Sequence, residues 1–160
     1  MTFSNSRNII ASRLLLFIAT FPFGAFLFLT YIEKMIRFPL FGFSEAVWVG
    51  SLSVIYFLIA YHPTILKYNF IYFSDDGKSI ILRYYSTGIF KGKRNSVEIP
   101  KESFAGFTRG RKLPLMIPYI VMHEKRRGII ASYPPIYLSA LRRRERRIMF
   151  LTLERYTPGR

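Results

Sequence analysis

The stretch LLLFIATFPFGAFLFLTYI, residues 14–32, decides the class of fold because its nineteen residues include no charged side chain. At about 1.5 Å per residue, a helix of this length crosses a hydrocarbon core about 30 Å thick. A second stretch without Lys, Arg, Asp or Glu covers residues 46–66 and is interrupted only by His62 and Pro63 near its end. Neither stretch has the polar stripe at 3.6-residue spacing that marks a helix on a soluble core. We therefore predict two transmembrane helices, over about 14–32 and 46–66.

Two other interpretations of these stretches are disfavoured. Buried helices of a soluble core would be apolar as well, but most such helices keep one polar face. A cleaved signal peptide has an apolar region of about 7 to 15 residues and a site of small residues after it. The first stretch is longer and no such site follows it, which favours a retained anchor.

Small residues at four-residue spacing predict that the two helices pack as an antiparallel hairpin. Thr20 and Gly24 have this spacing in the first stretch, and Ala46 and Gly50 have it in the second. Small side chains at this spacing let helix backbones approach closely in lipid.

Positive charge is concentrated in the second part of the chain. Of 160 residues, 24 are Lys or Arg and 9 are Asp or Glu; residues 1–66 carry only four of the cations and two of the acids. Cations flanking the two stretches outnumber those in their connection, which favours both termini in the cytoplasm of a multi-pass inner-membrane protein. The flanking cations are Arg7, Arg13, Lys67, Lys78 and Arg83, against Lys34 and Arg37 in the connection.

From residue 67 the pattern changes to short apolar runs separated by turn residues. Asp75-Asp76-Gly77-Lys78 between two runs rich in Ile, Phe and Tyr predicts a β-hairpin. The expected strands cover 69–74, 79–86, 89–93, 96–99, 103–109, 117–124 and 128–132, and Pro134-Pro135 is expected to end the series. A helix over about 139–156 follows. We thus expect an anchor over 1–66 and a basic domain over 67–160, built as a small antiparallel sheet or partly open barrel with one C-terminal helix.

The C-terminal helix has an expected core face and a second face that carries arginine. At 100° per residue, one side carries Leu141, Ile148, Met149, Leu151 and Tyr156. Phe150 projects opposite Leu141, beside Arg143 and Arg147. We expect Phe150 to contact something outside the domain, because Arg and aromatic side chains together are enriched at interfaces. The alternative is that this end of the helix is buried on two sides.

The arrangement resembles membrane-anchored bacterial proteins with a pleckstrin-homology-like domain. The resemblance covers about residues 46–157 and rests on the early strand hairpin with its Asp76-Gly77 turn, on Asn95-Ser96-Val97-Glu98-Ile99-Pro100, and on Leu138-Ser139-Ala140-Leu141 before the helix. It implies a sheet that curls into a partly open barrel, one C-terminal helix that closes an end, and a role in assembly, often by self-association. It implies no ligand, because no residue matches a ligand motif of that family.

Catalytic patterns are missing from the sequence. The chain has no cysteine and two histidines, His62 and His123, so thiolate chemistry is excluded and a metal site lacks ligands. Gly88–Lys93 has too few residues between its glycines for a phosphate-binding loop. We expect no catalytic residue, no cofactor and no metal, and therefore a protein that is not an enzyme.

Three interpretations of the basic residues remain open: a solvated face, contact with anionic lipid, and docking of an acidic partner protein. The expected contact residues are Arg126, Arg127, Arg142, Arg143, Arg146, Arg147 and Phe150. No DNA- or RNA-binding signature accompanies them, so a nucleic-acid partner is not expected. The sequence favours an accessory subunit that contacts lipids and other membrane subunits or copies of itself; the alternative is a module that binds anionic lipid at the membrane surface.

Overall fold

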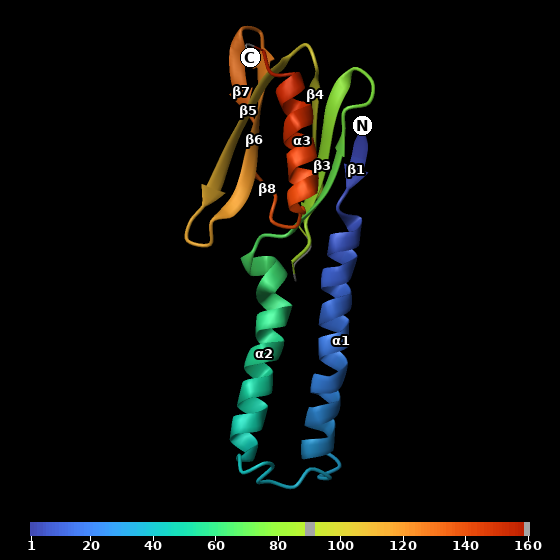
Figure 1. Ribbon diagram of the computed structural model, residues 1–160, viewed down its shortest axis with the longest axis vertical. Helices are drawn as coiled ribbons and strands as arrows, with labels where there is room; N and C mark the ends of the chain where they lie inside the picture. Colours follow the sequence, from blue (N-terminus) through green and yellow to red (C-terminus); the bar gives the residue numbers. More distant parts are fainter. Residues whose placement is uncertain (89–91, 159–160) are drawn as a thin grey trace. The chain divides into compact units, whose positions relative to one another are not determined.

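The computed structural model describes residues 1–88 and 92–158, which form two compact units (Figure 1). One unit is Ile10–His62, and the other joins Met1–Ile9 to the chain from Pro63 onward. The expected boundary near residue 66 therefore lies close to the observed one. The first nine residues, which we assigned to the anchor, belong instead with the sheets.

Two long apolar helices are present where the sequence predicts them. α1 covers Ser6–Tyr31 and α2 covers Glu45–Ile65. Both are long and apolar enough to cross a membrane, and only 6% of the most apolar window of each is buried within the structure. Helices of a soluble core would be mostly buried, so this exposure disfavours that alternative.

The predicted close packing at small residues is wrong for the two glycines. A Cβ atom added to Gly24 or to Gly50 would meet no atom within 4 Å, so neither glycine allows a close approach of backbones. Aromatic contact takes this role, because Phe23 of α1 stacks on Tyr56 of α2 with ring centroids 4.7 Å apart. Thr20 lies beside the same ring, with its hydroxyl 3.3 Å from that of Tyr56. Ala46, the fourth small residue, is at the start of α2.

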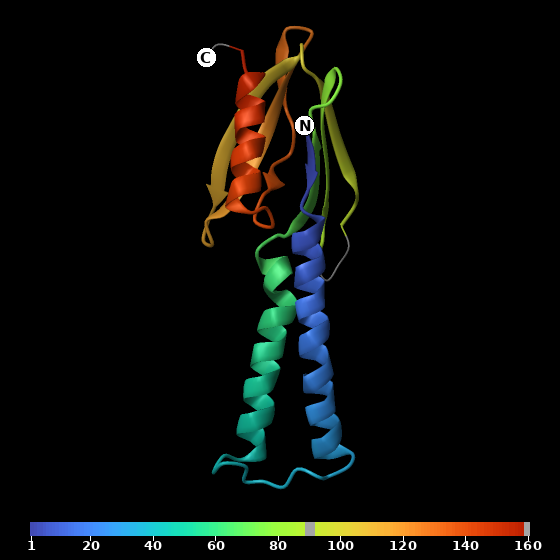
Figure 2. The ribbon, with the colours of Figure 1, turned by 45° about the vertical axis from the view of Figure 1, so that its right-hand side comes forward.

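The strands form two antiparallel sheets (Figures 1 and 2). The first has the order β1-β2-β3-β4, and the second has the order β5-β6-β7 with β8 also paired to β6. The bounds are β1 Thr2–Ser4, β2 Asn69–Ser74, β3 Ser79–Ser86, β4 Asn95–Pro100, β5 Phe104–Lys112, β6 Ile117–Arg126, β7 Ile129–Ser132 and β8 Ile136–Tyr137. Among the described residues no pairing joins the two sheets, so they do not form a closed barrel.

Six of the seven expected strands are confirmed; one is not, and two observed strands, β1 and β8, were not expected. Residues 89–91 of the expected strand over 89–93 lie outside the described residues, and residues 92–93 are not in a strand. Pro134-Pro135 does not end the series, because β8 follows it and pairs with β6 at Ile120 and Tyr119. β1 was not predicted at all. The hairpin between β2 and β3 is confirmed, with Gly77 at φ +75° as its turn requires.

One apolar core lies between the sheets, and the C-terminal helix covers it (Figure 2). α3 covers Arg143–Arg155 and buries Met149 and Leu153 completely. Its start is four residues later than expected, because Glu145 accepts a hydrogen bond from the Arg142 backbone N–H at 2.8 Å and so caps the helix. Leu141 is buried just before the helix, as predicted, but Leu151 is 56% exposed, so its assignment to the core face was wrong.

The short strand β1 is held by a buried asparagine that extends its pairing with β2. Asn5 is 1% exposed. Its Nδ2 donates to the Asn69 carbonyl at 2.8 Å, and its Oδ1 accepts from the Ile71 backbone N–H at 2.8 Å. The side chain thus satisfies a donor and an acceptor on β2 that would otherwise be buried without partners.

We expect Asn5→Ala to destabilise the sheet unit by about 1 to 3 kcal/mol, because it leaves those two backbone groups unpaired. Asn95→Ala is the matched control, since Asn95 is exposed and donates only to the nearby Lys93 carbonyl. Hydrogen exchange of β2 amides in the full chain in mild detergent measures the difference. Equal protection of β2 in the two variants would contradict the role given to Asn5.

Candidate functional site

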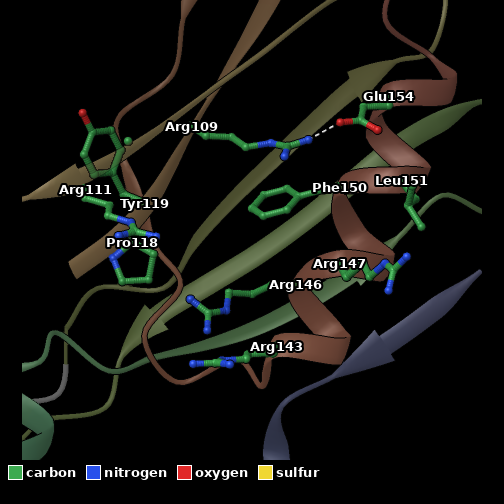
Figure 3. A pocket seen from close by; sticks show the side chains of 11 residues that line it. Arg109, Arg111, Pro118, Tyr119, Arg143, Arg146, Arg147, Phe150, Leu151 and Glu154 are labelled. Carbon is green, nitrogen blue, oxygen red and sulfur yellow. Dashed lines mark hydrogen bonds and ion pairs between the residues drawn. The ribbon is translucent and has the colours of Figure 1, made fainter. Parts of the chain in front are cut away.

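An open groove of about 720 Å³ lies between α3 and the β5–β6 hairpin (Figure 3). It is lined by Arg109, Gly110, Arg111, Pro118, Tyr119, Arg143, Arg146, Arg147, Phe150, Leu151 and Glu154. Five of these residues are arginines and one is an acid. The groove therefore brings positive charge together from separate elements, β5 and α3.

Helix α3 contributes one wall through residues at helical spacing. Arg143, Arg146, Arg147 and Phe150 are three, four and seven residues apart and so share one face. Phe150 and Arg143, grouped by the sequence, both line this wall. Figure 3 shows the side chains of Arg143 and Arg146 extending toward the strand side of the groove, while Arg147 extends the other way.

The opposite wall comes from β5 and β6. Arg109 and Arg111 are two residues apart on β5 and therefore project from the same face of the sheet. Gly110 is opposite Tyr119 of β6. A Cβ atom at Gly110 would lie 2.3 Å from the Tyr119 ring, so the glycine makes room for the ring to lie across β5 as part of the wall.

The floor of the groove is aromatic. Phe150 stacks on Phe107 of β5 with ring centroids 5.9 Å apart and planes 5° apart. The Arg109 guanidinium carbon lies 4.2 Å from the Phe150 ring centroid. Phe150 is thus half-buried against the sheet. This agrees better with the alternative expectation, in which this end of the helix is buried, than with a contact made only outside the domain.

Electrostatically the groove is suited to an anionic group. Arg109 is paired with Glu154, the only acid that lines the groove, and no other ion pair of a lining arginine is found in the described part of the chain. A guanidinium offers paired N–H donors that match carboxylate or phosphate oxygens. The arrangement can therefore bind an extended anion through several bidentate contacts.

The remaining predicted contact residues lie elsewhere. Arg126 ends β6. Arg127 and Gly128 form the turn to β7, and these two residues have positive φ. Arg142 has a structural role, because its Nε donates to Asn8 Oδ1 at 2.9 Å. These three residues do not line the groove.

Sequence reasoning missed Arg109, Arg111 and Tyr119 as members of the site. The expected strand over 103–109 ended at Arg109, so the sequence did not place Arg111 on the same strand face; the observed β5 extends to Lys112. The sequence also gave no sign that this part of β5 meets α3, which comes more than thirty residues later.

Within the described residues no group of three or more His, Asp or Glu could hold a metal ion. His123 lies on β6 between two hydroxyl groups, with Nε2 2.8 Å from Thr108 Oγ1 and Nδ1 2.9 Å from Ser132 Oγ. The neighbouring Glu124 is buried and accepts a hydrogen bond from the Tyr133 hydroxyl at 2.7 Å, which raises the pKa of Tyr133. These contacts join adjacent strands.

Comparison with known proteins finds no matching protein family, no similar curated protein and no similar solved structure.

We expect Phe150→Ala to destabilise the sheet unit by about 2 kcal/mol, because it removes half-buried apolar area and the stack on Phe107. Leu151→Ala is the control on the next residue, and its effect should stay within about 0.5 kcal/mol, as for a surface substitution. Hydrogen exchange of β5 and β6 amides in the detergent-solubilised full chain measures both. Equal destabilisation by the two variants would contradict the packing of Phe150 against Phe107.

Proposed function

We propose that the protein is a non-enzymatic, membrane-anchored interaction module that acts as an accessory subunit of a larger membrane complex. In this proposal an acidic segment of a partner protein docks in the arginine groove. The groove itself carries the proposal, because Arg109, Arg111, Arg143 and Arg146 come together there with Glu154 around an aromatic floor, and Arg147 lies at the edge. If the arginines formed only a solvated face, they would not be expected to cluster in one groove.

The length of the groove favours a polypeptide over a single phosphate or lipid headgroup. Its lining residues on α3 extend from Arg143 to Glu154, eleven residues apart, which is about 16 Å along a helix axis. An extended peptide of about five residues spans this distance at 3.3 Å per residue. Acidic side chains of such a peptide would meet the arginines, and an apolar one would meet Phe150.

The anchor in this proposal is a pair of transmembrane helices, α1 and α2. The apolar side chains that these helices expose support it, since exposure of this kind is costly in water and favourable in lipid. The pairing of β1 with β2 supports a common side for both ends of the hairpin, because one strand precedes α1 and the other follows α2. Together with the flanking cations, this favours both termini and the sheet unit on the cytoplasmic side of a bacterial inner membrane.

We also propose that the sheet unit is pleckstrin-homology-like. Two antiparallel sheets followed by a helix that covers their core support this proposal. Such domains commonly serve as interaction modules, which agrees with a docking role for the groove.

Photocrosslinking in cells tests the docking proposal. Leu151 lines the groove and is exposed, so a photoreactive amino acid at this position should form a discrete adduct with a partner protein. Ile130 on β7 is 63% exposed and outside the groove, and it is the control position for the same photoreactive residue. The adduct should be lost in the double variant Arg143→Glu and Arg146→Glu.

The matched charge control is Arg126→Glu with Arg127→Glu, which changes the net charge equally at the β6–β7 turn and should retain the adduct. Loss of the adduct in both double variants would indicate a general effect of charge and contradict docking in the groove. An adduct with lipid alone at position 151 would favour the alternative, a module that binds anionic lipid.

Membrane topology can be tested with single cysteines, because the native chain has none. Met35→Cys lies in the connection between α1 and α2, and Lys78→Cys lies in the turn between β2 and β3; both positions are exposed. We expect a membrane-impermeant thiol reagent to label position 35 in intact cells and position 78 only after the cells are opened. Labelling of position 78 in intact cells would reverse the proposed topology.

A further inference from the structure

The tip of the β5–β6 hairpin carries an exposed apolar cluster that the arginine groove does not use. Leu113 is 72% exposed, Leu115 is 51% exposed and Met116 is 50% exposed, and Pro114 lies between them. We call residues 113–116 the apolar tip. Three large apolar side chains in four residues of a polar surface indicate contact with something outside the chain.

The apolar tip lies at the end of the sheet unit where the chain enters from α2. α2 ends in a left-handed cap in which Lys67 has φ +50°, with hydrogen bonds from Tyr68 N–H to the Pro63 carbonyl and from Lys67 N–H to the Thr64 carbonyl. The Lys67 ammonium lies 3.3 Å from the Tyr137 hydroxyl. Tyr137 in turn is paired with Tyr119 on β6.

Lys112, the last residue before the apolar tip, joins the same cluster. Lys112 is paired with Ile117 on β6, two residues before Tyr119, the pairing partner of Tyr137. Burial acts to raise the pKa of Tyr137, but hydrogen bonds and positive charge from Lys67 and Lys112 outweigh burial, and the pKa is lowered. Lys112 at the base of the apolar tip and Lys67 just beyond α2 therefore lie in the same part of the sheet unit, around Tyr137.

The membrane surface must lie close to this cluster if α2 crosses the bilayer. Lys67 is two residues beyond Ile65, the last residue of α2, and two residues extend the chain by at most about 7 Å. Lys67 is then at headgroup level, and Lys112 lies beside it. Arg111 adds a third cation, and the sequence has no acid between residues 103 and 123. Cations around exposed leucine and methionine match an interface of anionic headgroups over acyl chains.

We propose that the apolar tip inserts into the cytoplasmic leaflet beside α2 and so fixes the sheet unit on the membrane surface at a second point. This inference rests on the membrane anchoring proposed above. The occupant of the apolar tip is the lipid interface, with Leu113, Leu115 and Met116 among the upper acyl chains and with Arg111 and Lys112 at the phosphates.

Fluorescence of single-cysteine variants of the full chain, reconstituted in vesicles of phosphatidylcholine and phosphatidylglycerol, tests the proposal. An environment-sensitive dye is attached at Leu115→Cys, at Ile130→Cys as the exposed apolar control on β7, and at Phe57→Cys as the reporter of the α2 span. We expect the dye at position 115 to show a blue shift and to be quenched by lipids spin-labelled near the headgroup. The dye at position 130 should show neither change.

The three positions separate the two proposals. Quenching at position 57 without quenching at position 115 would overturn the insertion of the apolar tip and leave the anchor intact. No lipid quenching at position 57 would overturn the anchor itself. A third outcome is a blue shift at position 115 that grows with protein concentration and is not accompanied by quenching from spin-labelled lipid. This outcome would place a second copy of the chain on the apolar tip and would also overturn the proposal.

The basic residues can be tested separately with Arg111→Glu and Lys112→Glu. Each reversal should shift the equilibrium toward the withdrawn tip by at least about fivefold in anionic vesicles, since one cation near such a surface contributes about 1 kcal/mol. The same variants should behave like the parent chain in vesicles of phosphatidylcholine alone. An equal effect in both kinds of vesicle would contradict the role of headgroup charge.

Discussion

Burial of Met149 and Leu153 between two sheets that do not close on each other is the contact on which the rest of the sheet unit depends. Each open sheet has an apolar inner face, and α3 supplies the wall that neither sheet provides. Because the helical period is fixed, the face that buries these two residues also determines which residues point outward. Arg143, Arg146 and Phe150 are directed toward β5 and β6 for this reason, and the groove exists only while α3 is docked.

A second constraint comes from the first residues of the chain. Asn5 and the three residues of β1 pair with β2. The helices α1 and α2 therefore connect two neighbouring strands of one sheet in the chain. Asn8 extends the connection toward α3, since its side chain donates to the Ala140 carbonyl at 2.9 Å and accepts from Arg142. The segment before α1 and the segment after α2 therefore both pack in the same sheet unit.

The β5–β6 hairpin has two surfaces of opposite chemistry, and we assign a different partner to each. Its face toward α3 carries the cations Arg109 and Arg111, whereas its tip carries the exposed apolar residues Leu113 and Leu115. With the apolar tip in lipid, the Arg111 end of the groove lies near the headgroups and the Glu154 end lies away from them. An acidic partner segment would then approach from the membrane surface, as expected for another subunit of the same complex.

The sequence alone determined the apolar helices, most strands, and the arginine face of α3, because each follows from a local period of hydrophobic or charged residues. It also predicted the turn at Gly77, where local backbone geometry requires a particular residue. Only the tertiary structure decided that β1 pairs with β2, that Gly24 and Gly50 are not packing sites, and that Leu151 is exposed while Phe150 rests on Phe107. The tertiary structure also decided which residues form the second wall of the groove, since Arg109 and Arg143 are far apart in the chain. Long-range contacts of this kind depend on how complete faces fit together, and the fit has no signature in a local pattern of residues.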